Sequence, residues 1–169
     1  MSAGSIDNKC YSRARLKALY GAHPALRRWM EKPYEFVAKY HVPYVGGIHC
    51  EGDPVYGDHR LKYERVNLGG RVVDIRPVVA AHERMEWWLV THLGMSYDEA
   101  HVWANTAERA KAEEIGVQYG TYNDYIDGHV DEIEGAPLKN LAPGLAKYPY
   151  RSDKKIMRAL AINPRKVAS

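Results

Sequence analysis

Cysteine and long hydrophobic runs are scarce in this chain of 169 residues. Its 2 cysteines, Cys10 and Cys50, form no Cys-x-x-Cys pair, which excludes a zinc ribbon, and they are too few for a disulfide framework. No apolar stretch approaches the roughly 18 residues of a membrane-spanning helix. Residues 1–9 also lack the apolar segment of a secretory signal. We therefore expect a protein of a reducing cytosol with no membrane partner.

A strong charge of either sign is also missing. The net charge is +3 and the basic residues are spread along the chain, so no nucleic-acid partner is evident. The sequence has no phosphate-binding loop, dinucleotide fingerprint or Gly-x-Ser-x-Gly nucleophile elbow. One Phe against 13 Tyr and 4 Trp indicates either a core of aromatic side chains with polar tips or a surface that contacts a partner.

The alternation of helical and extended patterns predicts an α+β fold. Helical spacing covers residues 11–20 and 24–40, with a break or kink expected at Pro33. Short extended segments lie between residues 42 and 75 and include a turn at Gly69 and Gly70. We expect these strands to form a small antiparallel edge sheet or hairpins packed on a helical core.

The helical core is expected within residues 77–133, and residues 1–135 are expected to form a single globular domain. Within it, a helix ends at Gly94, and Ser96 with Glu99 fits the capping box that begins the next helix. A connection this short predicts that the two helices pack antiparallel or at a moderate angle. Residues 136–169 contain several prolines and glycines, which predicts a C-terminal arm that carries a short helix.

The segment His82-Glu83-Arg84-Met85-Glu86 is the most informative motif. Residues four apart lie one above the other on a helix, so His82 and Glu86 share a row with the apolar Val78 and Leu89. This places a carboxylate on the inward face of the helix. A carboxylate is almost never fully buried unless it is paired or bound to a metal.

The following helix carries a matching row with His101 and Glu108. If the two helices face each other, His82, Glu86, His101 and Glu108 converge in one polar pocket. His101 and Glu108 are seven residues apart, about 10 Å along a helix, so one ion does not easily take both as ligands. The third ligand is then either His101 or Glu108, and the other orients a metal-bound side chain.

The motif resembles that of the zincin metallopeptidases, with Glu86 in place of the second histidine of His-Glu-x-x-His. The resemblance implies that Glu83 is the general base that takes a proton from a metal-bound water. Together with Tyr56 to Arg60 and the later His101 and Glu108, the pattern is similar to uncharacterised phage and prophage proteins over residues 43–128. The implied cofactor is Zn²⁺, with Fe²⁺ or Mn²⁺ as alternatives because two imidazoles and one carboxylate also suit these ions. A lost metal is a further alternative.

Two classes of function remain open. The first is a zincin-like hydrolase encoded by a phage or prophage that cuts peptide bonds in a protein or peptide partner in the host cytosol. The second is a non-enzymatic virion, assembly or host-interaction protein that contacts phage structural proteins or a second copy of itself. In the second class the His/Glu cluster is a structural hydrogen-bonded network. Asp58 and His59 are weaker candidates, either as a ligand and substrate-orienting pair or as an ordinary surface pair.

Overall fold

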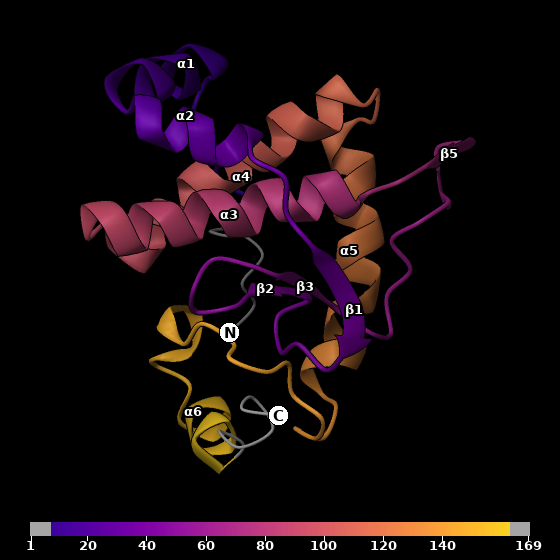
Figure 1. Ribbon diagram of the computed structural model, residues 1–169. Helices are drawn as coiled ribbons and strands as arrows, with labels where there is room; N and C mark the ends of the chain where they lie inside the picture. The colour runs from indigo at the N-terminus through magenta and orange to yellow at the C-terminus, as the bar shows by residue number, and fades with distance from the viewer. Residues whose placement is uncertain (1–7, 163–169) are drawn as a thin grey trace.

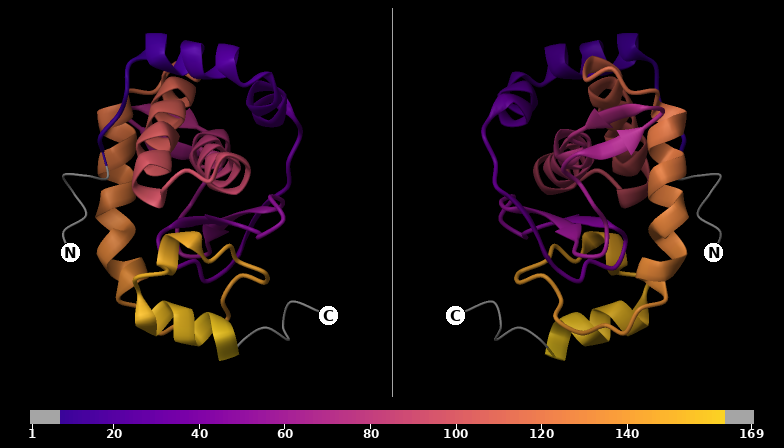
Figure 2. Two further views of the ribbon diagram at one scale, coloured as in Figure 1. Left: turned by 90° about the vertical axis from the view of Figure 1, so that its left-hand side faces the viewer. Right: turned by 90° about the vertical axis from the view of Figure 1, so that its right-hand side faces the viewer.

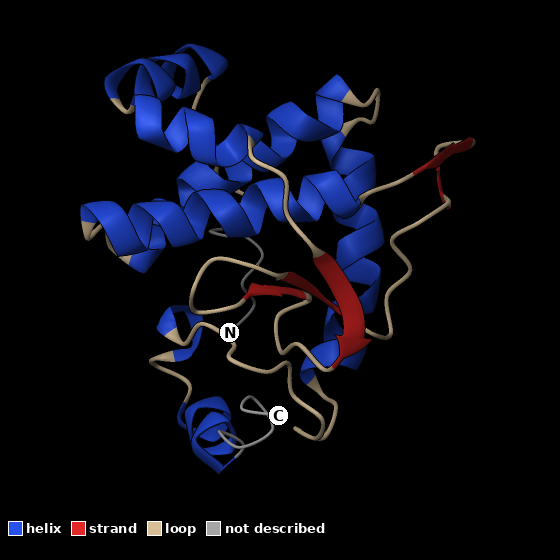
Figure 3. Cartoon of the chain, viewed as in Figure 1, coloured by secondary structure: helices blue, strands red, loops and turns tan. Residues whose placement is uncertain are grey.

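The computed structural model describes residues 8–162 and confirms an α+β fold in which helices predominate (Figures 1 and 3). Figure 2 shows the elements in successive layers: two N-terminal helices, a central helix pair, a small sheet, and the C-terminal helices. A further long helix runs along one side of these layers. Within this part of the chain, no helix combines the length and the apolar character needed to cross a bilayer.

The N-terminal part begins with helices α1 (Arg13–Ala22) and α2 (Pro24–Glu31). The side chain of Ser12 caps α1 by accepting a hydrogen bond from Arg15 N, and Pro24 opens α2. The expectation of helix over residues 24–40 is wrong in its second half, because strand β1 (Phe36–Tyr40) follows Pro33. A proline disfavours helical dihedrals in the residue before it, so α2 ends early and the chain leaves it extended.

Strand β1 joins β3 (Val55–Asp58) and β2 (Gly46–Ile48) in a three-stranded sheet of order β1-β3-β2. The pair β1–β3 is parallel and the pair β2–β3 antiparallel, so the sheet is mixed where an antiparallel one was expected. Strands β4 (Val66–Leu68) and β5 (Arg71–Val73) form the separate hairpin predicted at Gly69 and Gly70.

Helices α3 (Arg76–Leu93) and α4 (Tyr97–Glu114) form the central pair. Gly94 ends α3 in the left-handed conformation, and the Ser96 side chain accepts a hydrogen bond from Glu99 N at the start of α4. His82 of α3 contacts Glu108 near the end of α4, whereas Glu86 contacts His101 near its start. The contacts run in opposite order along the two helices, which confirms that they pack antiparallel.

Helix α5 (Tyr119–Glu134) is followed by the segment expected to be a separate arm. This segment contains a 3₁₀ turn, η2 (Tyr148–Tyr150), and helix α6 (Lys154–Ile162). Its apolar side chains are buried in one cluster with Val42 and Tyr56; they are Leu141, Ala142, Leu145, Tyr150, Ile156 and Leu160. The expected boundary at residue 135 therefore does not separate a globular domain from an arm, because side chains of residues 141–160 pack in the same core as Val42 and Tyr56. Residues 1–7 and 163–169 of the predicted domain and arm lie outside the described residues.

Candidate metal centre

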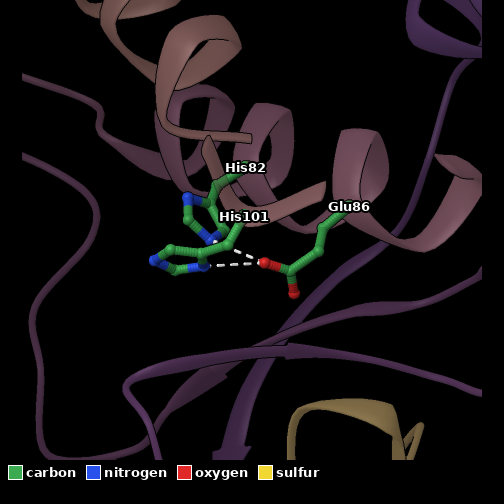
Figure 4. A group of neighbouring side chains, drawn as sticks. All are labelled: His82, Glu86 and His101. Carbon is green, nitrogen blue, oxygen red and sulfur yellow. Dashed lines mark hydrogen bonds and ion pairs between the residues drawn. The ribbon is translucent and has the colours of Figure 1, made fainter. Parts of the chain in front are cut away.

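His82, Glu86 and His101 meet between α3 and α4 (Figure 4). One carboxylate oxygen of Glu86, Oε2, lies 2.8 Å from His101 Nδ1 and 3.4 Å from His82 Nε2. One ligand atom from each residue lies within 4.8 Å of the other two, so the group could hold a metal ion. The sequence predicted His82 and Glu86 and left the third ligand open between His101 and Glu108; the geometry brings His101 into the group.

Glu108 instead lies behind His82. Its Oε2 is 3.2 Å from His82 Nδ1, on the opposite side of the ring from the Nε2 that faces Glu86. The other oxygen, Oε1, accepts a 2.7 Å hydrogen bond from the Tyr119 hydroxyl, and the Tyr122 hydroxyl lies 3.5 Å from Oε2. A carboxylate beside the second nitrogen of an imidazole favours a proton there and leaves Nε2 free to coordinate an ion.

Opposing effects set the protonation of this cluster. Burial alone raises the pKa of Glu86, but the hydrogen bond from His101 and the contact with His82 outweigh it and hold this pKa at about 2. Burial alone lowers the pKa of His82, but the carboxylates of Glu108 and Glu86 outweigh it and raise this pKa well above the usual value. Before a cation binds, the cluster therefore holds an ionised Glu86 against a protonated His82.

Glu83 has a different environment, although it follows His82 directly. Its side chain is buried and forms no hydrogen bond or ion pair within residues 8–162. Burial raises its pKa to about 8, and the negative charges of Glu86 and Glu108 add to this effect while His82 opposes it. A Cβ atom added to Gly46 of β2 would lie 2.6 Å from Glu83 Oε1, so the bare backbone of β2 passes directly over this carboxyl group.

Tyr148 was not predicted at this site, yet its hydroxyl is buried here. Burial and the nearby carboxylates of Glu86 and Glu83 raise the pKa of Tyr148 well above the usual value. The carboxylate of Glu86 lies within hydrogen-bonding reach of this hydroxyl. The Tyr148 ring lies 6.1 Å from that of Tyr97, which in turn lies 5.5 Å from the His101 ring. Helix α5 separates Tyr148 from α4 along the chain, and Tyr148 belongs to no periodic pattern. Its position at the site therefore depends on tertiary contacts that the sequence pattern does not indicate.

Asp58 and His59 do not form a surface pair. Asp58 is completely buried, whereas His59 is exposed. Asp58 Oδ2 lies 3.0 Å from His41 Nδ1 and accepts a hydrogen bond from Val42 N, while Oδ1 accepts two hydrogen bonds from Arg60. This second polar cluster ties β1 to β3 and does not join the His82 group. The sequence signal for it was weak because a strand that is buried on both faces has no alternating pattern.

No protein-family model, curated protein or solved structure matches this chain. The assignment of a function therefore depends on the geometry of the residues themselves.

Proposed function

We propose that the protein is a metal-dependent hydrolase of the zincin type that cuts peptide bonds. The observation that carries the proposal is that one ligand atom each from His82, Glu86 and His101 lies within 4.8 Å of the others; the buried Glu83 directly follows His82 in α3. Two imidazoles and one carboxylate are a donor set that zinc uses in hydrolytic sites and that also suits Fe²⁺. When bound, the ion supplies a Lewis acid that lowers the pKa of a water molecule.

The protein side chains then have separate tasks. His82, Glu86 and His101 hold the ion, and Glu108 orients the His82 ring through Nδ1. Glu83 would take a proton from the water and later transfer it to the leaving amine, the task of a general acid and base, because its carboxyl is buried next to His82 in α3. The proposed origin in a phage or prophage depends on the sequence resemblance alone.

Metal binding is the first test. Purified protein is freed of metal with a chelator and titrated with Zn²⁺, and binding is followed by calorimetry and by thermal unfolding. We expect one ion per chain and, at a hundredfold excess over the dissociation constant, a rise in melting temperature of about 5–10 °C. Variants His82→Ala and Glu86→Gln should lose this rise, whereas His59→Ala and Glu51→Gln at exposed positions should keep it.

Hydrolysis is the second test. Zinc-loaded protein should release fragments from an unfolded protein such as casein, and Glu83→Gln should abolish the release while it retains the metal. Chains that fold but take up neither Zn²⁺, Fe²⁺ nor Mn²⁺ would refute the proposal. They would favour the non-enzymatic alternative, in which the four His and Glu residues only hold α3 against α4.

A further inference from the structure

The outer edge of β2 is occupied by residues from the C-terminal part of the chain. Ala146 N donates a 2.8 Å hydrogen bond to Ile48 O, and Cys50 N donates a 2.7 Å hydrogen bond to Gly144 O. These two bonds flank an antiparallel bridge between His49 and Leu145. The segment thus pairs antiparallel with residues 48–50 at the end of the sheet edge, through a single bridge that resembles the pairing of an extended peptide with an exposed edge.

The same segment continues directly to the candidate metal centre. After Ala146 the chain turns through η2, and Tyr148 comes to lie against Glu86 and Glu83. Figure 4 shows part of the C-terminal chain, in gold, below the carboxylate of Glu86. The side chains of His82, Glu86 and His101 are only 12%, 2% and 15% exposed, so the centre is closed to a large substrate.

Residues 144–150, which we name the closing segment, reach from the sheet edge to the centre, and their displacement would also expose Leu145 and Tyr150, which are buried against the sheet. The closing segment has one backbone hydrogen bond to Ile48 of β2 and one to Cys50 just beyond that strand, and it lies between Leu141, which is bridged to His41, and helix α6. The Tyr148 hydroxyl near the end of this segment is buried against the carboxylate of Glu86. Gly144 has a φ of +63°, which only glycine adopts readily, and it packs against the His49 ring.

We propose that the outer edge of β2 is a peptide-docking edge that the closing segment occupies in the free protein, and that a substrate peptide must displace this segment to reach the metal centre. The inference rests on the proposed function, since it is the hydrolase that requires an open path to Glu83. The occupant is the chain itself, and the partner that replaces it is an extended peptide that pairs antiparallel with β2.

A reversible tether tests this inference. His49 and Leu145 form a non-hydrogen-bonded antiparallel pair, in which Cα atoms are about 4.5 Å apart, within the range that a disulfide spans. We would introduce His49→Cys and Leu145→Cys together with Cys10→Ser and Cys50→Ser. The oxidised protein holds the closing segment on β2, and the reduced form of the same protein releases it.

The first readout needs no metal. Diethyl pyrocarbonate modifies accessible neutral imidazoles, and mass spectrometry gives the rate at His101, with exposed His59 as the internal standard. We expect reduction of the tether to raise the rate at His101 at least tenfold and to leave His59 unchanged. Equal rates in the two forms, whether fast or slow, would overturn the inference, because the segment would then either not cover the centre or not move.

The second readout separates this inference from the proposed function. With Zn²⁺ present, casein hydrolysis should appear on reduction and cease on oxidation. A difference in imidazole modification without hydrolysis in either form would keep the closing segment and refute the hydrolase. Equal hydrolysis in the oxidised and reduced forms would support the hydrolase and refute the role of the closing segment.

A second variant guards against misfolding of the tethered protein. Gly144→Ala places a Cβ atom against the His49 ring at a positive φ, so the closing segment should loosen and modification of His101 should accelerate about tenfold without a tether. Gly120→Ala in α5 has open space at the same position and is the matched control. Identical rates in Gly144→Ala, Gly120→Ala and the unchanged protein would also overturn the inference.

Discussion

Glu83 and Glu86 show how two carboxylates of one helix turn acquire different chemistry. Glu86 accepts contacts from two imidazoles and keeps its charge, whereas Glu83 faces the backbone of β2 and gains no partner. Their pKa values are consequently driven apart, to about 2 and about 8. Pairs of titratable groups separated in this way mark the division between a group that binds charge and a group that transfers protons.

The pKa of Glu83 predicts a cost in stability that is removed by Glu83→Gln. A carboxyl whose pKa is raised on folding stays protonated in the folded protein while the unfolded chain loses its proton, so the free energy of unfolding falls as the pH rises from 4.5 to about 8. In metal-free protein at pH 8 we expect Glu83→Gln to be more stable by an amount on the order of a few kcal/mol, with no difference near pH 4. Urea unfolding at both pH values measures this. Glu51→Gln is the control, and a variant that is less stable at pH 8 would contradict the prediction.

The protonated His82 predicts that metal binding releases a proton. Because the pKa of His82 is raised well above its usual value, a cation that takes Nε2 must compete with a proton at neutral pH. The affinity for Zn²⁺ should therefore rise as the pH rises from 6 to 8, by about tenfold per pH unit for one released proton. Calorimetry in two buffers of different ionisation enthalpy counts the released protons. A pH-independent affinity would place the ion elsewhere.

At this scale the sequence allowed two members of the candidate metal group to be predicted and left the third open. His82 and Glu86 follow from the spacing of four on a helix, whereas the row on the next helix offered both His101 and Glu108. Glu108 was in the right cluster, but only the relative rotation of the helices shows that it lies behind His82 and outside the ligand group. Tyr148 lies in a segment without periodicity, so no local pattern could associate it with the site.

Among the secondary structure elements, those with strong local signals were predictable and those selected by tertiary contacts were not. Gly94 and Ser96 fixed the limits of α3 and α4 through their own backbone conformation and side-chain hydrogen bond. Strand β1 was missed because Phe36–Tyr40 carries apolar residues that fit either a helix or a strand. Its strand conformation comes from pairing with β3, which lies later in the chain.

The close approach of β2 to α3 predicts that a side chain at Gly46 would displace Glu83. In Gly46→Ala the new Cβ atom would lie 2.6 Å from Glu83 Oε1 and 3.2 Å from Val79 Cγ1, so the Glu83 side chain must move. Because the carboxyl is the end of a flexible side chain, we expect the variant to fold and to bind Zn²⁺ as before but to hydrolyse casein about a hundredfold more slowly. Gly21→Ala, which meets no atom within 4 Å, should show unchanged rates. Unchanged hydrolysis in Gly46→Ala would remove Glu83 from the role of base.

For the whole molecule, the C-terminal residues are the main lesson about prediction from sequence. Their prolines and glycines indicated an arm outside the globular domain, but Leu141, Leu145 and Tyr150 are buried against the sheet. Short irregular segments give no periodic signal even when every second or third side chain is buried. The abundance of tyrosine had two interpretations, a core of aromatics with polar tips or a partner surface. Four tyrosines, Tyr56, Tyr63, Tyr122 and Tyr150, are buried, which supports the first interpretation.

The buried Asp58 of β3 connects this strand to His41 and Val42, which follow β1. We expect its carboxylate to make the stability of the protein depend on pH. Its carboxylate receives hydrogen bonds from Val42 N and from Arg60 and contacts His41, the residue whose backbone pairs with Asn140 and Ala142. Burial alone would raise the pKa of Asp58, but His41, Arg60 and Val42 outweigh it and hold this pKa well below the usual range.

A carboxyl with a lowered pKa stabilises the folded protein above its unfolded pKa of about 4, and this contribution is lost as the pH falls further. We therefore expect Asp58→Asn to lower the free energy of unfolding at pH 7 by about 3 kcal/mol, because Arg60 keeps its charge without a partner carboxylate. The difference from the unchanged protein should shrink between pH 4 and pH 2. Urea unfolding across this range measures it, with Asp131→Asn at an exposed position of α5 as the control. A constant difference at all pH values would mean that Asp58 contributes shape and hydrogen bonds to the junction of β1, β3 and the C-terminal chain, and that its charge contributes nothing.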